Sequence, residues 1–286
     1  SSMRVAFDLM KQGEVRAVVS AGNSGAMMAT GMFVMRNLPG IERPAILVVI
    51  PSSAGSTVMI DAGANTDCRP RHLVQFGLMG SVYAERVLGV SRPRVGILSN
   101  GEEEGKGTER TRAASEQIRS TGLYCIGYVE GRDITNGRVD VVVCDGFTGN
   151  ICLKTMEGLA GFIMNVLRET FQQNTMSRLG FLLCKRSLRK AYGRLDYTEY
   201  GGAPLMGLDG VAIVAHGGSS PKAIKNAIRV AKETVSQDVN SHIVDMLEGM
   251  NGPGEDKEEG FSRRVWQQIR SKIDTLGDKP NPDEEG

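Results

Sequence analysis

Residues 139–150 read VDVVVCDGFTGN, an apolar, mostly β-branched run that stops at a loop of aspartate, glycine and asparagine. A continuous hydrophobic run without alternation is typical of a strand buried on both faces. Four further segments repeat this pattern: AVVSAGNSGA from Ala17, VMIDAGANTD from Val58, VGILSNGEEEGKG from Val95 and VAIVAHGGSS from Val211. Helix-like segments usually follow the loops, so we predict an α/β fold with a doubly wound, mostly parallel sheet whose polar loops share one edge.

Ligands of open α/β sheets bind beyond the carboxyl ends of the strands. Loops of small residues expose backbone N–H groups to anions there, particularly at helix starts. The loops therefore predict a site for a phosphate-like group. The residues that we expect to bind phosphate or substrate are Asn23, Ser24, Gly25, Asp61, Asn65, Asn100, Asp145, Gly146, Gly149, Lys154, Gly217 and Ser219. Asp61 and Asp145 could equally have a structural role, in which they cap a helix or hydrogen-bond a loop, instead of a role in the site.

The chain divides into an α/β domain over residues 1–248 and a different tail over 249–286. The domain opens with an amphipathic helix at Met3–Gln12, whereas a doubly wound domain normally opens with a strand, so we expect a further segment before Ser1. The tail is acidic and contains proline and glycine, which predicts disorder. Apolar residues at helical spacing predict one short helix within it, at 261–276.

Composition narrows the class of protein. The 286 residues carry a net charge of +1, which gives no field for nucleic acid. Five cysteines without a C-x-x-C pair indicate a reducing compartment rather than a disulfide or zinc framework. The sequence shows no signal peptide and no apolar stretch that could span a bilayer, so we expect a cytoplasmic protein, still able to sit on a membrane surface.

Residues 171–196 are expected to form a protruding hairpin. Within them, SRLGFLLCKRSLRKAYGR starts at Ser177 and sets an apolar cluster beside a basic run. This arrangement is typical of a hairpin lying in an anionic membrane interface, or gripping an acidic carrier protein. Packing against a second subunit is an equal alternative. The expected docking residues are Leu179, Phe181, Leu182, Leu183, Lys185, Arg186, Arg189 and Lys190.

Six segments in order, AGNSGAMMA, DAGANTDCRP, NGEEEGKG, CDGFTGNICLKTMEG, EYGGAPLMGLDG and AHGGSS, closely resemble the PlsX family of bacterial phosphate acyltransferases. The resemblance implies a fold like those of phosphate acetyltransferases and isocitrate dehydrogenases, and a homodimer that associates peripherally with membrane through a helical hairpin. It implies reversible transfer of a fatty acyl group from acyl carrier protein to inorganic phosphate, without a cofactor. The acyl phosphate formed would serve phospholipid synthesis, near the glycerol-3-phosphate acyltransferase that consumes it. The glycine-rich opening strand of these enzymes has no counterpart here.

This chemistry can be compared with the residues. Phosphate is the nucleophile and a thiolate with a pKa near 8.5 leaves, so no serine or cysteine nucleophile is required. The site needs a cation and N–H donors for phosphate, and a donor for the oxyanion. We expect Lys106, Asn150 and His216 to supply them, although His216 has an alternative as a satisfied core histidine. The three glutamates at 102–104 would repel a phosphate anion, so we expect them to form a solvated loop.

Other chemistries lack their motifs. The loop GEEEGKG has three residues before its second glycine and a glycine after Lys106, unlike a P-loop. No G-x-G-x-x-G follows a strand, GNSG at 22–25 is too short for a nucleophile elbow, and three histidines without paired spacing do not indicate a metal site. Two alternatives stay open: a short-chain phosphate acyltransferase that uses coenzyme A, and a catalytically silent membrane-associated scaffold.

Overall fold

The computed structural model describes residues 1–195 and 201–251, with side chains over 1–188 and 201–250. Within the described residues, Ser1–Leu247 form one compact unit. The helix expected at 261–276 lies outside the described residues. The strands in the described part are β1 (Ala17–Ser20), β2 (Ala45–Ser52), β3 (Gly55–Ile60), β4 (Val95–Leu98), β5 (Cys125–Val129), β6 (Val141–Val143), β7 (Ala203–Met206) and β8 (Val211–Val214). The helices there are α1 (Ser2–Lys11), α2 (Ser24–Val34), α3 (Pro70–Arg86), α4 (Glu109–Arg119), α5 (Asp133–Asn136), α6 (Gly146–Gln172), α7 (Thr175–Leu195), α8 (Pro221–Ser236) and α9 (Val239–Asn251).

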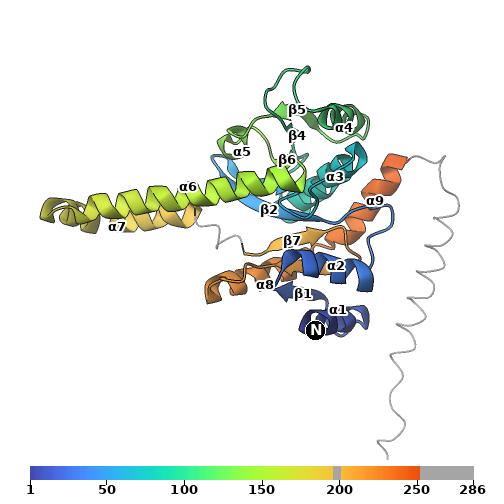
Figure 1. Cartoon of the computed structure of the whole chain (residues 1–286), viewed down its shortest axis with the longest axis horizontal. Helices are drawn as coiled ribbons and strands as arrows, with labels where there is room; N and C mark the ends of the chain where they lie inside the picture. Colours follow the sequence, from blue (N-terminus) through green and yellow to red (C-terminus); the bar gives the residue numbers. More distant parts are fainter. Residues whose placement is uncertain (196–200, 252–286) are drawn as a thin grey trace, which may run out of the picture. The chain divides into compact units, whose positions relative to one another are not determined.

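The strands form one mixed, mostly parallel sheet in the order β1-β8-β7-β2-β3-β6-β4-β5, with helices packed on it (Figure 1). Parallel pairing joins β1 to β8, and β3, β6, β4 and β5 to one another. The joins from β8 to β7, β7 to β2 and β2 to β3 are antiparallel. The predicted α/β class is therefore confirmed.

The expected common edge for the polar loops is wrong. Three successive antiparallel joins reverse the strand direction between the two parallel groups. The loops after β1 and β8 consequently leave the opposite edge of the sheet from those after β3, β6 and β4. The sequence prediction failed because it treated all five strands as parallel.

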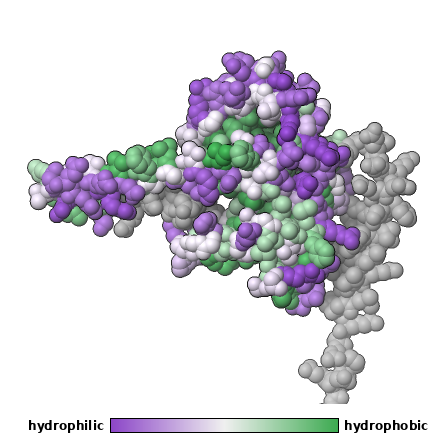
Figure 2. Space-filling view, in the orientation of Figure 1, coloured by the Kyte–Doolittle hydropathy of each residue, from purple (hydrophilic) through white to green (hydrophobic). Residues whose placement is uncertain are grey.

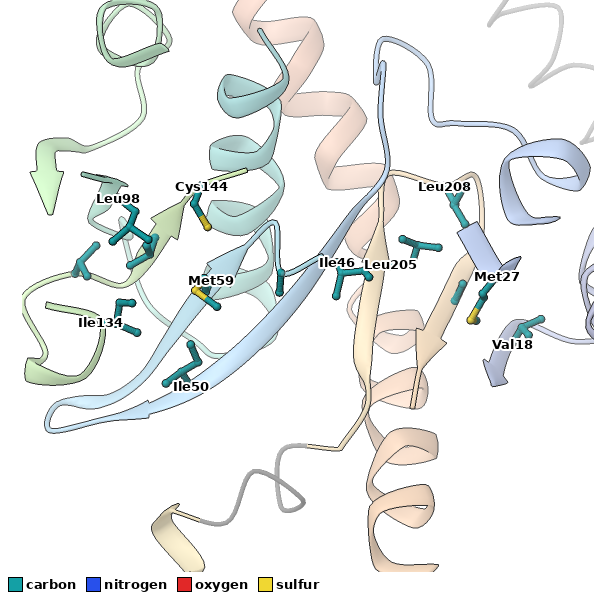
Figure 3. Close-up of a cluster of buried hydrophobic side chains, with 14 of the residues drawn as sticks. Val18, Met27, Ile46, Ile50, Met59, Leu98, Ile134, Cys144, Leu205 and Leu208 are labelled. Carbon is teal, nitrogen blue, oxygen red and sulfur yellow. The ribbon is translucent and has the colours of Figure 1, made fainter. Parts of the chain in front are cut away.

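The hydrophobic core runs without a break across both parallel groups. It includes Val18 of β1, Met59 of β3 and Leu98 of β4 in a single cluster (Figure 3). Helix α3 begins with Pro70, whose fixed φ suits a first helical position, and every residue from His72 to Ala84 is buried. A helix that is buried on all sides fixes the strands that it covers, here mainly β6 and β3.

Helices α6 and α7 form an antiparallel hairpin that extends away from the sheet (Figure 1). It is longer than the predicted hairpin, since α6 starts at Gly146 and the DGFTGN motif forms its first turn. The expected docking leucines lie inside α7, where the exposed fraction of Leu183 is 79%. The side chains of Arg189 and Lys190 lie outside the described residues.

In Figure 2 an apolar band lies along the hairpin, beside hydrophilic residues that cover much of its outer half. None of the helices within residues 1–195 and 201–251 combines the length and the apolar character needed to cross a membrane.

Candidate active site

The loops after β3, β6 and β4 meet around a hollow of about 380 Å³. Its walls come from the loop before α3, from α3 itself, from the start of α4 and from the residue that caps α6. The lining residues are Cys68, Leu73, Thr108, Glu109, Arg110, Thr111 and Asp145. Of these, only Asp145 was among the residues expected from the sequence. The threonine that follows GKG, at a helix start, is the signal that could have pointed to Thr108.

Asp61 holds the loop after β3 together. Its Oδ1 accepts hydrogen bonds from the backbone N–H groups of Ile46 (3.0 Å), Gly63 (3.0 Å) and Ala64 (2.9 Å), and its Oδ2 accepts from Asn65 N (2.7 Å) and Nδ2 (2.9 Å). Burial raises the pKa of this carboxyl, and the hydrogen bonds oppose that shift. Because both oxygens are occupied and the side chain is fully buried, Asp61 is placed to organise the loop.

Asn65 is likewise engaged in the loop. Its Nδ2 also donates to the carbonyl of Pro44 (2.7 Å), and the residue is buried. One amide hydrogen bond therefore joins this loop to the residue before β2, and the other, to Asp61, stays within the loop.

The first turn of α6 packs backbone to backbone against this loop. Asp145 caps the helix, since Oδ1 accepts from Thr148 N (2.8 Å) and Oδ2 from Thr148 Oγ1 (2.9 Å). Gly146 N–H donates to Asn65 O (2.7 Å). A methyl group added to Gly149 would lie 2.0 Å from the carbonyl oxygen of Asp61. Gly146 and Gly149, two of the glycines expected to bind phosphate or substrate, are thus required for close packing.

Asn150 follows on the same turn and is exposed beside Gly63. Lys154 lies one turn beyond Asn150 and eight residues after the start of α6, and its Nζ pairs with Glu157 Oε2 at 2.8 Å. The sequence pattern predicts a helix that begins just after Asn150, with Lys154 in its first turn, and this expectation is wrong because α6 already begins at Gly146.

The cysteines near the hollow are unreactive. Burial, with the charges of Asp61 and Asp145, raises the pKa of the Cys68 thiol to about 12. Burial also raises the pKa of the fully buried Cys144. A thiol that stays protonated is a poor nucleophile, so these residues fill space.

The loop after β4 presents Lys106 to solvent. Asn100 Oδ1 accepts a hydrogen bond from Gly107 N (3.0 Å), which closes the base of the loop. Lys106 makes no ion pair within the described side chains, whereas Glu102 and Glu104 are paired with arginines. The sequence had predicted a solvated acidic run and did not indicate those partners.

The loops after β1 and β8 form a second group of expected residues. Asn23 caps α2 by accepting from Ala26 N (2.9 Å), with Ser24 and Gly25 in the first turn. His216 is exposed and its Nδ1 accepts from Gly218 N (3.1 Å), which leaves the proton on Nε2. A methyl group on Gly217 would lie 3.6 Å from Ala21 O, so the two loops are neighbours.

Ser219 completes this second group, with its N–H donated to the carbonyl of His216 (2.9 Å). The structure thus brings the expected residues together in two groups, one at each edge of the sheet. Asn100, Lys106 and Asn150 belong to the edge with the hollow, whereas Asn23 and His216 belong to the other.

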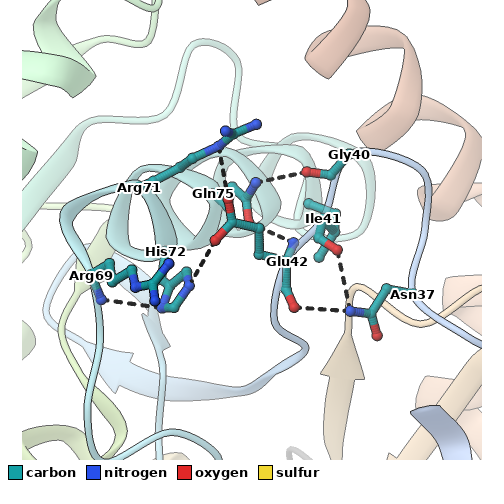
Figure 4. A network of polar contacts seen from close by, with 8 residues as sticks. All are labelled: Asn37, Gly40, Ile41, Glu42, Arg69, Arg71, His72 and Gln75. Atoms are coloured by element: carbon teal, nitrogen blue, oxygen red, sulfur yellow. Dashed lines mark hydrogen bonds and ion pairs between the residues drawn. The ribbon is translucent and has the colours of Figure 1, made fainter. Parts of the chain in front are cut away.

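His72 has a structural role in a separate polar network (Figure 4). Its Nδ1 accepts from Arg69 N (3.2 Å), and its Nε2 lies 2.9 Å from Glu42 Oε2. Gln75 joins the same network by donating to Gly40 O (2.7 Å) and accepting from Glu42 N (3.0 Å). The network fastens the chain between α2 and β2 to helix α3.

Solved structures share the fold at low sequence identity. A EutD phosphotransacetylase from Staphylococcus aureus superposes with a TM-score of 0.53 at 15% identity, covering 82% of this chain and 67% of that one. A phosphotransacetylase from Streptococcus pyogenes gives 0.52 at 16% identity, covering 86% of this chain and 67% of that one.

Proteins found by sequence comparison share a much higher sequence identity with the chain than these solved structures do. A family model described as "Fatty acid synthesis protein" matches residues 1–242. The phosphate acyltransferase of Geotalea daltonii is 54% identical over 248 residues, covering 87% of this chain and 72% of that protein, and the phosphate acyltransferase of Geobacter sulfurreducens gives the same values. With this identity over most of both proteins, the chain belongs to the phosphate acyltransferase family.

Proposed function

We propose that the protein transfers a fatty acyl group from acyl carrier protein to inorganic phosphate. A phosphate oxygen attacks the thioester carbonyl, a C–O bond forms, the C–S bond breaks, and the carrier thiolate leaves and takes up a proton. The observation that supports this most is Lys106, which is exposed and has no ion-pair partner among the described side chains, at the sheet edge that holds the hollow. Its ammonium supplies a cation where the loops and the start of α4 supply donors.

In this proposal the edge with Lys106 performs the chemistry. Lys106 and the first N–H groups of α4, which Thr108 caps, bind phosphate. The exposed amide of Asn150 donates to the oxyanion that develops on the thioester carbonyl. Cysteine nucleophiles are unnecessary, in keeping with the raised pKa of Cys68.

His216, at the other edge of the sheet, is proposed to donate a hydrogen bond to substrate through its Nε2–H, with Asn23 and the glycines of its loop also binding substrate. A His216→Gln variant tests whether His216 takes part in the chemistry, although it lies at the opposite edge of the sheet from Lys106. A large loss of kcat supports a place for His216 at the reacting carbonyl. An unchanged kcat assigns the chemistry to the edge with Lys106 alone.

The test of the function is phosphate-dependent release of thiol from a long-chain acyl carrier protein. Lys106→Ala should raise the KM for phosphate about 10- to 100-fold, the value of one charge-assisted hydrogen bond, and change the KM for the acyl donor little. Lys154→Ala is the matched control, because that lysine is paired with Glu157 and should change neither constant more than about twofold. Equal phosphate dependence in Lys106→Ala and the unmodified enzyme would contradict the role of Lys106.

Acyl carrier protein is favoured as the donor by the apolar and basic face of α7, where Leu179, Lys185 and Arg186 are exposed. A small coenzyme A ester needs no such docking surface. The assay therefore compares a long-chain acyl carrier protein with acetyl coenzyme A, and faster turnover of the latter would support the short-chain alternative. No phosphate-dependent turnover of either would support a silent scaffold.

We also propose a cytoplasmic homodimer that binds anionic membrane peripherally, near the glycerol-3-phosphate acyltransferase that uses its product. Helix α6 exposes an apolar stripe along one face, and a second copy would cover it. The stripe consists of Ile151, Leu159, Phe162, Ile163 and Val166. The outer face of α7, with Met176, Leu182 and Leu183 exposed, is then left for lipid.

A further inference from the structure

The loop that carries Lys106 is shaped from within by two hydrogen bonds. Asn100 Oδ1 accepts from Gly107 N (3.0 Å), and Glu103 O accepts from Lys106 N (2.9 Å). Both bonds connect one part of the loop to another. The direction in which the loop points therefore depends on its contacts with the rest of the molecule.

Glu102 makes the most extensive of these contacts. Its Oε1 pairs with Arg138 Nη1 and lies 3.5 Å from Arg132 Nη2. Hydrogen bonds from Arg138, more than from Arg132, lower the pKa of this carboxyl. Both arginines flank the short helix α5, which follows the neighbouring strand β5. The carboxylate of Glu102 thus connects the loop after β4 to the segment around α5, which follows β5.

The two arginines are themselves held in place. Arg132 Nη2 pairs with Glu130 Oε2 at 2.8 Å, and Arg138 Nη1 lies 3.7 Å from Asp133 Oδ2. Asp133 is buried, with 1% of its surface exposed, and accepts from Glu130 N (2.8 Å) and Asn136 Nδ2 (2.7 Å). The network that starts at Glu102 therefore ends on a buried, fixed carboxylate.

Glu104 differs although it lies in the same loop. Among the side chains that the structure describes it pairs only with Arg119 Nη1, at 3.3 Å, and its side chain is 86% exposed, against 37% for Glu102. Exposed single pairs contribute little to structure, whereas a multiply bonded network restricts its members. Glu104 is thus the natural control for Glu102.

We infer that Glu102 is a positioning residue for acyl transfer, which together with Arg132 and Arg138 directs Lys106 toward phosphate. The inference rests on the proposed function, since it assumes that Lys106 binds phosphate. The arrangement has a second effect: a free carboxylate four residues before a phosphate-binding lysine would repel phosphate, and two guanidinium groups neutralise it.

The first experiment compares Glu102→Gln with Glu104→Gln in the phosphate-dependent assay. Glu102→Gln should raise the KM for phosphate about 5- to 20-fold while the kcat and the KM for the acyl carrier protein change less than about twofold. Glu104→Gln should change all three constants less than twofold. Arg138→Gln, which removes the partner instead, should reproduce the Glu102→Gln effect. Equal constants for the Glu102 and Glu104 variants would overturn the inference.

The second experiment combines Glu102→Gln with Lys106→Ala. If Glu102 acts through Lys106, its substitution should raise the KM for phosphate no further in the Lys106→Ala background. If the KM for phosphate in the double variant rises by the product of the two single effects, the inference is overturned. Thermal unfolding of each variant excludes general destabilisation, which would lower kcat in both backgrounds. Loss of phosphate dependence only in Lys106→Ala refutes the inference and keeps the proposed function, whereas an unmodified enzyme without phosphate-dependent turnover refutes both.

Discussion

Two glycines decide how α6 starts. A methyl group on Gly149 would lie 2.0 Å from Asp61 O, and one on Gly146 would lie 2.8 Å from the backbone N and O of Asn65. Backbone atoms cannot move aside as a flexible side chain does. The closeness of helix and loop in turn places Asn150 beside Gly63, at the sheet edge with the hollow. Residues of no chemical function thus fix the position of a proposed oxyanion donor.

We expect Gly149→Ala to destabilise the protein by roughly 3 kcal/mol or more, because the added methyl must push the helix away from the loop. Gly158→Ala is the matched control: it lies in the same helix and a methyl there meets nothing within 4 Å. The control should stabilise by about 0.5 to 1 kcal/mol, the helix propensity difference. Urea unfolding of both variants measures the contrast. A Gly149→Ala variant as stable as the control would contradict the packing described here.

At the scale of elements, β4 and β6 are joined at their starts by one ion pair. Arg94 donates from its backbone N and Nε to Asp140 Oδ2 (both 2.8 Å) and from Nη2 to Oδ1 (2.9 Å). Arg94 Nη2 also donates to Gly137 O (2.9 Å). Although burial alone would raise the pKa of Asp140, the hydrogen bonds from Arg94 lower it overall. A bidentate pair with a backbone bond fixes the register of two parallel strands.

Because the pKa of Asp140 is lower in the folded than in the unfolded protein, this pair stabilises the fold above the unfolded value, near 3.9. That stability is lost as the pH falls through the folded value. We expect Asp140→Asn to cost about 1 to 2 kcal/mol at pH 7, and the difference from the unmodified protein to shrink as the pH falls below the unfolded pKa and through the lower folded pKa. Urea unfolding from pH 7 to pH 2 measures it.

The control for this prediction is Asp8→Asn, which removes an exposed pair with Arg4 on helix α1. It should cost about 0.5 kcal/mol or less at pH 7. A pH-independent loss in Asp140→Asn would mean that packing, and not charge, connects the two strands.

Some elements of the fold could be predicted from the sequence and others could not. The five strands could be predicted from local apolar runs, because a strand that is buried on both faces needs apolar residues at every position. Their directions did not, since they depend on pairings such as Ala45 with Met206, between segments far apart in the chain. The glycines of DGFTGN indicated a loop, whereas the fold uses them for close packing in a helix. The arginine partners of Glu102 lie about 30 residues away and left no local signal.

At the scale of the whole molecule, the hairpin offers two apolar faces. We expect Leu182→Glu with Leu183→Glu to release the protein from anionic vesicles, because each exposed leucine removed from lipid costs about 1.5 to 3 kcal/mol, or together about 100-fold or more in affinity. The kcat with soluble acyl carrier protein should change little, whereas the KM for that donor should rise, because Leu179 and Arg186 of the proposed carrier-docking face lie one helical turn from these leucines. Vesicle co-sedimentation and the assay measure the two effects.

The matched variant is Leu159→Glu with Ile163→Glu, which places the same charges on the stripe of α6. It should split the homodimer, observed by sedimentation velocity, because a charge on a dry interface is costly. If the α7 variant dissociates the dimer and keeps its vesicle binding, then α7 is the subunit interface and the membrane proposal is wrong.

The pairing of β1 with β8 has a consequence for how the protein is made. Ala17 lies opposite Val211, roughly 190 residues later in the chain. At ribosomal speeds of about 5 to 20 residues per second, β1 is synthesised about 10 to 40 s before its partner exists. During that interval an apolar strand and the neighbouring face of α2 have no sheet to join. This stretch stays without its sheet partner until β8, the last strand in the part of the chain that the structure describes, has been synthesised.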